Sequence, residues 1–147
     1  MLTLDKIYHA AFVLKEVARR TDLIHAPNLC PDAELYLKTE NLQVTGSFKL
    51  RGAYYKISQL TDEQKRAGII ACSAGNHAQG VALAATRQGA KSVVFMPDSA
   101  PISKVEATKR LGAEVCLVNG AYDDAYEAAV RRQEAVSYTH LRAHETK

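Results

Sequence analysis

Three apolar runs of strand length, each followed by a stretch of helical character, constrain the fold of this chain most strongly. The runs are GIIAC (68–72), SVVFM (92–96) and EVCLV (114–118), and the stretches after them span about 76–87, 101–111 and 121–135. Short, continuously apolar strands that alternate with helices are typical of a parallel sheet buried on both faces. The sequence therefore predicts an α/β fold of three layers, a parallel sheet with helices on both faces. Right-handed crossovers place the loops after the strands along one edge of the sheet, where we expect a ligand.

The remaining elements have weaker signals. Residues 3–20 carry apolar side chains at spacings of three and four, which predicts an amphipathic helix. The segment ELYLK (34–38) alternates apolar and polar residues and predicts a strand. Ser47 is a candidate N-cap for the next helix, and TDEQ (61–64) has the spacing of a capping box. Pro101 suits the first position of a helix.

Composition indicates a soluble globular protein and excludes several other classes. The chain has 147 residues, of which 47% are hydrophobic and 24% charged, with a formal net charge of +3. The basic residues form no stripe, so nucleic-acid binding is not expected. No apolar run approaches the roughly 20 residues that a membrane span needs, and the N-terminus lacks the pattern of a signal peptide. Three widely spaced cysteines suggest reduced thiols, so we expect a cytoplasmic protein.

Two stretches carry candidate chemistry. TGSFKLRG (45–52) places Lys49 where a strand pattern gives way to a helix pattern, and such a lysine is either a solvated surface charge or a usable amine. SAGNHAQG (73–80) leaves the first apolar strand and enters a helix. Its backbone N–H groups and the helix dipole favour an anion, with an ordinary tight turn as the alternative. Val81 stands where a P-loop needs lysine, and no G-x-G-x-x-G occurs, so both nucleotide motifs are excluded.

Together, these stretches resemble a known family. The resemblance rests on LKTENLQVTGSFKLRGA (37–53), ACSAGNHAQGVALAA (71–85) and MPDSAPISKVEATKRLGAEVCLV (96–118). In the same order, these segments are similar to the pyridoxal-phosphate enzymes of the tryptophan-synthase-β type, or fold type II. Within that group they are most similar to the threonine/serine dehydratases (threonine ammonia-lyases). The resemblance covers about residues 3–135 and implies the small domain of such an enzyme with the start of its large domain.

The resemblance implies roles at matching positions. Lys49 would form the Schiff base with pyridoxal phosphate, Phe48 would lie against the cofactor ring, and Asn76 would hydrogen-bond the ring hydroxyl. Plain core packing is the alternative for Phe48. Five residues would form the loop that grips the substrate carboxylate: Ser73, Ala74, Gly75, Asn76 and His77. We expect His77 to be structural rather than a general base, because the loop acts through backbone amides, and we expect Arg51 to brace the helix start.

The resemblance also implies a reaction. A partly desolvated lysine is a usable nucleophile and proton carrier, so Lys49 would remove the substrate's α-proton before the β-hydroxyl leaves. L-threonine would yield 2-oxobutanoate and ammonia, and L-serine would yield pyruvate. Isoleucine biosynthesis and a catabolic role both remain open for such an enzyme. Ala74 stands where serine racemases of the family carry a serine that exchanges a proton, which favours elimination over racemisation. A racemase, a β-replacing synthase and a non-catalytic binding module remain the alternatives.

The end of the chain departs from the pattern. VSYTHLRAHETK (136–147) breaks the helical apolar spacing, supplies no next strand and resembles the translated read-through of sequencing adapters. No metal is expected, since the pair His140 and His144 lacks the glutamate of a zinc motif. We expect residues 1–136 to be the N-terminal part of a truncated catalytic domain and residues 137–147 a non-native tail. Because family members are more than twice this length, the fragment alone should be inactive and the full-length protein a homo-oligomer.

Overall fold

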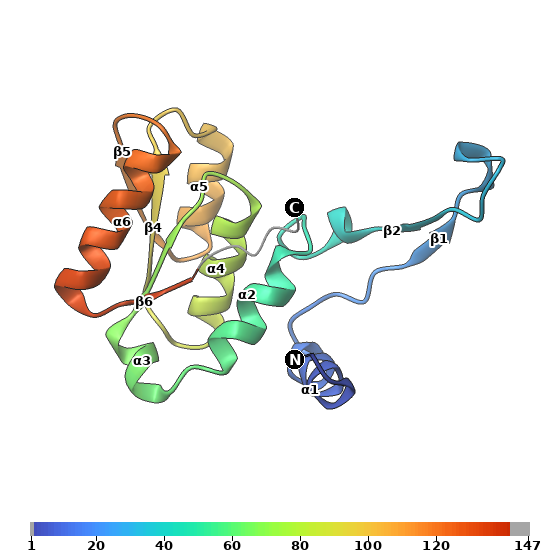
Figure 1. Ribbon diagram of the computed structural model, residues 1–147, viewed down its shortest axis with the longest axis horizontal. Coiled ribbons are helices and arrows are strands. Elements are labelled where there is room, and N and C mark those ends of the chain that lie inside the picture. Colours follow the sequence, from blue (N-terminus) through green and yellow to red (C-terminus); the bar gives the residue numbers. More distant parts are fainter. Residues whose placement is uncertain (1, 142–147) are drawn as a thin grey trace.

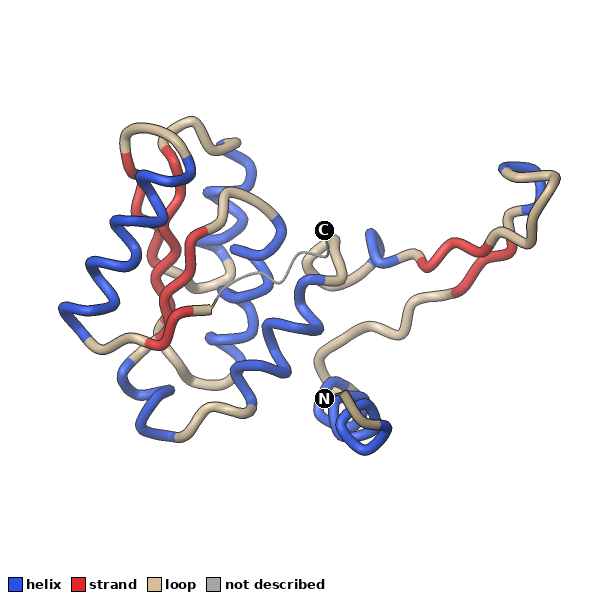
Figure 2. The backbone as a smooth tube through the Cα atoms, viewed as in Figure 1, coloured by secondary structure: helices blue, strands red, loops and turns tan. Residues whose placement is uncertain are grey.

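A parallel sheet forms the centre of the molecule. The computed structural model describes residues 2–141, which divide into an α/β body (residues 49–141) and an N-terminal arm (residues 2–48) that extends away from it (Figure 1). Four parallel strands lie in the order β5-β4-β3-β6 (Figure 2). They are β3 (Ile69–Cys72), β4 (Ser92–Pro97), β5 (Glu114–Val118) and β6 (Thr139–His140). Every residue of β3 and β4 is buried, and the predicted parallel sheet is confirmed.

Helices cover both faces of this sheet, as predicted (Figure 1). One face carries α2 (Lys49–Ser58), α4 (Asn76–Arg87) and α5 (Ile102–Arg110), and the other carries α6 (Tyr122–Val136). The short α3 (Asp62–Ala67) leads into β3. The helix predicted over 76–87 has those bounds, and the other two predicted helices differ by one residue at each end. Pro101 lies at the N-cap of α5, one residue before the predicted position.

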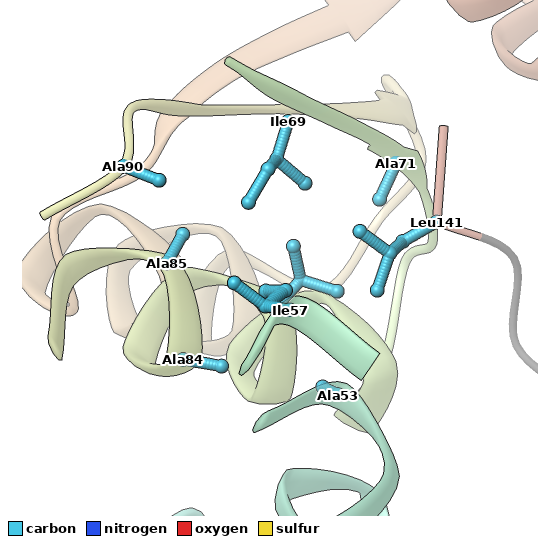
Figure 3. Packing of buried hydrophobic residues seen from close by; sticks show 9 residues of the cluster. Ala53, Ile57, Ile69, Ala71, Ala84, Ala85, Ala90 and Leu141 are labelled. Atoms are coloured by element: carbon cyan, nitrogen blue, oxygen red, sulfur yellow. The ribbon is translucent and has the colours of Figure 1, made fainter. Parts of the chain in front are cut away.

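Side chains alternate along β3 and divide the core between the two layers of helices. Ile69 and Ala71 point to the side of Ile57 on α2 and the alanines of α4 (Figure 3). Ile70 and Cys72 face the other way, against the alanines of α6. This alternation follows from the two-residue period of a strand. Small residues on α4 and α6 let both helices lie close to the sheet.

The local signals for helix starts gave one correct and one wrong prediction. The capping box at α3 is confirmed, because Gln64 N donates to Thr61 Oγ1 (3.2 Å) and Thr61 N donates to Gln64 Oε1 (2.9 Å). Ser47 is not the N-cap of α2, since Phe48 takes that position and Arg51 N donates to Phe48 O. The Ser47 side chain is instead buried, and its hydroxyl makes no hydrogen bond to the first turn of the helix.

The N-terminal arm has little packing of its own. It contains α1 (Leu4–Leu14), the antiparallel pair β1 (Leu23–His25) and β2 (Tyr36–Lys38), and the short helices η1 (Pro27–Leu29) and η2 (Glu40–Leu42). The strand predicted over 34–38 is present in its last three residues. The helix predicted over 3–20 ends at Leu14, and none of its residues is buried. An amphipathic helix is stabilised mainly by the surface against which it packs, so α1 is shorter than its apolar pattern.

The chain continues as a strand where we expected none. After α6 it turns at Ser137, whose φ of 54° is left-handed, and β6 then pairs with β3 at Ile69 and Ile70. The expectation of no further strand after Ala135 is therefore wrong. Leu141 is only 4% exposed and belongs to the core cluster of Ile57 and Ile69 (Figure 3). His144, the second member of the histidine pair, lies outside the described residues.

Candidate active site

Lys49 lies at the first residue of α2, and its backbone is held against α4. The contact is at Gly80, where an added Cβ would lie 3.1 Å from both the carbonyl carbon and the carbonyl oxygen of Lys49. Only a residue without a side chain allows so close an approach without displacement. Since α4 begins at Asn76, the contact brings the start of α2 within about one helical turn of the loop that precedes α4. Gly80 therefore allows the start of α2 to pack close to the loop before α4. In the sequence, Gly80 draws notice only as part of an incomplete P-loop motif.

The loop that precedes α4 lies at the carboxyl edge of the sheet, as predicted. Ser73 follows β3 directly, and its backbone N–H donates to Phe95 O of β4 (3.0 Å). Gly75 N donates to Ser73 Oγ (3.3 Å), which fixes the turn. No side chain caps α4, and the side of Gly75 where a Cβ would project meets no atom within 4 Å. Amides at an uncapped helix start, open on one side, are suited to an anionic group.

Asn76 is the first residue of α4, and its side chain is exposed. Its Oδ1 accepts a hydrogen bond from Lys104 Nζ at 2.7 Å. Lys104 belongs to the first turn of α5, which follows β4, so the two residues come from the carboxyl ends of neighbouring parallel strands. Lys104 was not among the residues predicted from the sequence. The available signal was its place near the start of the helix after the second apolar strand, at the sheet edge where a ligand was expected.

Phe48 is 57% exposed, so it is not part of the core that the described residues form. Lys49 Nζ lies 5.3 Å from the centroid of the Phe48 ring, within the range of a cation–π interaction. An exposed aromatic side chain beside an amine can receive a planar ring. This agrees with the role that the family resemblance implied for Phe48.

His77 and Ala74 both pack into the protein. His77 is buried, and its Nε2 lies 3.4 Å from the carbonyl oxygen of Leu141, which can accept a hydrogen bond from the ring. This contact supports the expected structural role of His77. Ala74 packs against the cluster between β4, α4 and α5. Its methyl group offers no proton to exchange, which bears on the choice between elimination and racemisation.

A bidentate ion pair joins the arm to the start of α2. Arg51 donates from Nε and Nη2 to the two carboxylate oxygens of Glu40, each at 2.8 Å, and Thr21 Oγ1 also donates to Glu40 (2.6 Å). The hydrogen bonds from Arg51 lower the pKa of Glu40 from 4.5 to about 2, and the pKa of Arg51 is raised in return. Arg51 also donates to Arg19 O (3.2 Å). Arg51 therefore braces the helix start, as expected.

The thiols take no part in this chemistry. Cys72 ends β3 immediately before the loop, and burial raises its pKa to about 11, so it is neutral at physiological pH. Cys30, Cys72 and Cys116 are all free. Within residues 2–141, no group of three or more His, Cys, Asp and Glu side chains is placed to hold a metal ion. The chemistry of the site therefore rests on the amine, the amide and the loop.

A hollow of about 560 Å³ lies between α1 and α2, away from these residues. Its lining comes from both helices and consists of Asp5, Lys6, His9, Gly52, Tyr55, Lys56 and Gln59. His9 Nδ1 and Tyr55 Oη, 3.1 Å apart, form a hydrogen bond across it. None of the predicted site residues lines this hollow. The candidate site is thus the open edge formed by the starts of α2, α4 and α5.

Fold and site together define a class: an α/β enzyme that presents a lysine and an amide-lined loop at the carboxyl edge of a parallel sheet. The chain belongs to the pyridoxal-phosphate dependent enzyme family, whose sequence profile matches residues 14–146. This match extends beyond Ala135, where we expected the resemblance to stop. The fold-class prediction is confirmed by solved structures of the same family.

Individual relatives narrow the comparison. The chain is 52% identical over 136 residues to the L-threonine ammonia-lyase of Thermotoga maritima, a match that covers 91% of this chain and 34% of that relative. It resembles the structure of maize serine racemase with a TM-score of 0.89 and 31% identity, over 98% of this chain and 44% of that one. It also resembles the structure of threonine deaminase isoform 2 from Solanum lycopersicum, with a TM-score of 0.83 and 33% identity. That match covers 96% of this chain and 41% of the other. The chain thus spans about a third of the length of the Thermotoga relative.

The residues present fit the family's cofactor. An amine at Lys49, an exposed aromatic ring at Phe48 and a carboxamide at Asn76 are the donor set that the resemblance requires. In addition, Thr45 Oγ1 and Ser47 Oγ are buried without a hydrogen-bond partner among the described residues. Leaving a buried hydroxyl unpaired costs about 1–3 kcal/mol. Both hydroxyls lie within four residues of Lys49 in the sequence, in the segment that leads into α2.

Proposed function

We propose that the parent protein of this chain is a threonine ammonia-lyase that converts L-threonine to 2-oxobutanoate and ammonia, and L-serine to pyruvate and ammonia. The observation that carries the proposal is the contact between the Lys49 backbone and Gly80, which packs the start of α2 against α4, the helix that follows the loop. The 52% identity to a threonine ammonia-lyase supports the choice of reaction. Because the chain spans only about a third of that relative, the activity belongs to the full-length protein.

Each residue has a defined task in this reaction. Lys49 would hold the cofactor through Nζ, and its free amine would take the α-proton. The backbone amides of residues 73–77 bind the substrate carboxylate and fix which bond to the α-carbon is broken. Asn76 donates to the ring oxygen, and the exposed face of Phe48 receives the ring. Bound pyridoxal phosphate supplies an electron sink for the carbanion. The β-hydroxyl would leave as water with the proton that Lys49 took from the α-carbon, and a second water would then release ammonia and the 2-oxo acid by hydrolysis.

A racemase is the second candidate, because the maize serine racemase has a similar structure. Racemisation needs a proton donor on the opposite face of the α-carbon. Ala74 has no exchangeable proton, and it packs against the core. We therefore favour elimination over racemisation. A β-replacing synthase and a non-catalytic module have less support than either.

The test is an assay of the full-length parent protein with both substrates. We expect 2-oxobutanoate from L-threonine, and only trace D-serine from L-serine by chiral chromatography. Lys49→Ala should lower the rate by several orders of magnitude, because nucleophile and proton carrier are lost together. Lys91→Ala, at a lysine between α4 and β4, is the control. D-serine in amounts similar to pyruvate would favour the racemase, whereas no turnover and no borohydride-reduced cofactor adduct on Lys49 would favour the non-catalytic binding module.

The fragment itself is proposed to be an incomplete catalytic domain over residues 1–136, followed by a non-native tail over residues 137–147. We expect the fragment to be inactive, and borohydride reduction with pyridoxal phosphate should label Lys49 in the full-length protein far more than in the fragment. Resequencing the gene beyond codon 136 tests the tail directly. A reading frame that continues past that codon with family-like sequence would support a non-native tail. A genuine stop after Lys147 would contradict it.

The setting of the parent protein follows from its substrates. The proposed amino-acid substrates and the free cysteines support a cytoplasmic enzyme of amino-acid metabolism, with isoleucine biosynthesis as one candidate pathway. We propose a homo-oligomer with no nucleic-acid partner. Over residues 2–141, no helix is both long and apolar enough to cross a membrane. Cell fractionation and light scattering of the full-length protein would check the location and the oligomer.

A further inference from the structure

The contact between Lys104 and Asn76 has no counterpart in the roles assigned so far. Lys104 Nζ lies 2.7 Å from Asn76 Oδ1, a short charge-assisted hydrogen bond between residues 28 positions apart. Lys104 is half-buried, and it approaches Asn76 from the first turn of α5. An ammonium group has donors and no acceptor, so it can bind only the oxygen of the carboxamide. The contact therefore fixes which way the Asn76 amide faces.

Helix stability does not explain this placement. Lys104 lies in the first turn of α5, and its ammonium group reaches the first residue of α4, so a cation lies near the positive ends of two helix dipoles. Cations are favoured at the opposite end of a helix. Lys109 illustrates the favourable case, because it lies in the last turn of α5 and pairs with Glu106 (3.1 Å). A cation held against the dipoles points to an anion that binds beside it.

We propose that Lys104 is a positioning residue for the cofactor. By holding Asn76 Oδ1, it leaves the Nδ2 hydrogens of the amide as donors to the ring oxygen of pyridoxal phosphate. Its positive charge also stabilises that oxygen as the phenolate. The inference rests on the proposed function, since it needs a cofactor that Asn76 faces. The family resemblance assigned no role to Lys104, no orientation to the Asn76 amide and no charge to the ring oxygen.

The test uses the full-length parent protein with Lys104→Met, which removes the charge and keeps an unbranched chain. Two quantities are measured: the dissociation constant for pyridoxal phosphate and the absorption spectrum of the bound cofactor. We expect roughly tenfold weaker binding, as for the loss of one charge-assisted hydrogen bond. The absorption band of the bound cofactor should shift from the visible to the near ultraviolet, because the ring oxygen changes from a phenolate to a neutral phenol. Lys109→Met, the same change on the same helix away from Asn76, should alter neither quantity.

A second pair of variants shows whether Lys104 acts through Asn76. Asn76→Ala alone should shift the spectrum, and Lys104→Met in that background should weaken binding by less than about twofold more, because coupled residues are not additive. Should Lys104→Met fail to fold, Lys104→Gln removes the same charge with a side chain of similar length. A spectrum and affinity equal to those of Lys109→Met would overturn the inference alone. A wild-type protein without any cofactor band would overturn the proposed function and the inference together.

Discussion

The body of this chain buries mainly apolar side chains, whereas the arm buries few side chains of any kind. In the body, residues 49–141, three apolar clusters pack on the two faces of the sheet. In the arm, residues 2–48, the described buried side chains are all polar: Thr21, Gln43, Thr45 and Ser47. Most of the exposed large apolar side chains of the chain also belong to the arm, from Leu2 to Phe48. Apolar burial is the main favourable term in folding, so the body carries its own stabilisation and the arm does not.

The difference indicates how the two regions depend on the rest of the parent protein. The arm is joined to the body through polar contacts such as the pair of Glu40 with Arg51. The chain spans about a third of the Thermotoga relative, so the longer protein has many residues to cover the arm. A surface rich in exposed apolar side chains is typical of an interface. We therefore expect the body to fold much as described in the fragment, and the arm to be stabilised mainly in the full-length protein.

The largest expected effect tests the contrast directly. Ile57 is fully buried in the cluster between α2, α4 and β3, so Ile57→Ala in the 147-residue chain should cost about 2–5 kcal/mol of unfolding free energy. Phe12 in α1 is 78% exposed, and Phe12→Ala should cost less than about 0.5 kcal/mol. Urea denaturation monitored by circular dichroism measures both. In the full-length protein, Phe12→Ala should become more costly. Equal costs for the two variants in the fragment would remove the distinction between body and arm.

The second effect concerns the contact that positions Lys49. Gly80→Ala places a methyl group 3.1 Å from the Lys49 backbone, so α2 must shift, at a cost of about 1–3 kcal/mol. Turnover in the full-length protein should fall as well, because the amine moves relative to the loop. Gly52→Ala is a matched control within α2, where an added Cβ meets nothing within 4 Å. That variant should be neutral or stabilising by up to about 1 kcal/mol. Similar losses from both variants would refute the packing role of Gly80.

The smallest effect concerns the polar join between arm and body. Glu40→Gln removes the charge from the pair with Arg51 and should cost about 1–2 kcal/mol. The pKa of Glu40 is lower in the folded protein, about 2 against 4.5. Its contribution is therefore full above pH 4.5 and is lost as the pH falls towards 2. Thermal unfolding of wild type and variant between pH 6 and pH 2 should show the two converging in acid.

An exposed pair on α6 is the control for that experiment. Arg131 and Glu127 lie one turn apart, 3.4 Å between their charged atoms, and both are largely exposed. Glu127→Gln should change stability by no more than about 0.5 kcal/mol. A gap between wild type and Glu40→Gln that persists down to pH 2 would contradict the assigned pKa.

The sequence by itself determined the elements whose signals are local. The three apolar strands, the limits of α4 and the capping box of Thr61 and Gln64 each depend on a few neighbouring residues, and each was predicted correctly. The loop predicted over residues 73–77 is present at residues 73–75, whereas Asn76 and His77 already belong to α4. A small-residue turn between a strand and a helix has a local signature, although the exact start of the helix does not. A candidate site at the sheet edge follows from the strand–helix alternation alone.

Tertiary structure decided what depends on distant residues. The contact of Gly80 with Lys49 and the hydrogen bond of Lys104 with Asn76 join different helices, and no local pattern encodes which helix faces which. Ser47 is buried and does not cap α2, and burial depends on the tertiary environment rather than on neighbouring residues in the sequence. The end of α1 at Leu14 has the same origin, since an apolar face extends a helix only where another surface packs against it. Local periodicity fixes secondary structure, whereas the geometry of this site arises from packing between elements far apart in the chain.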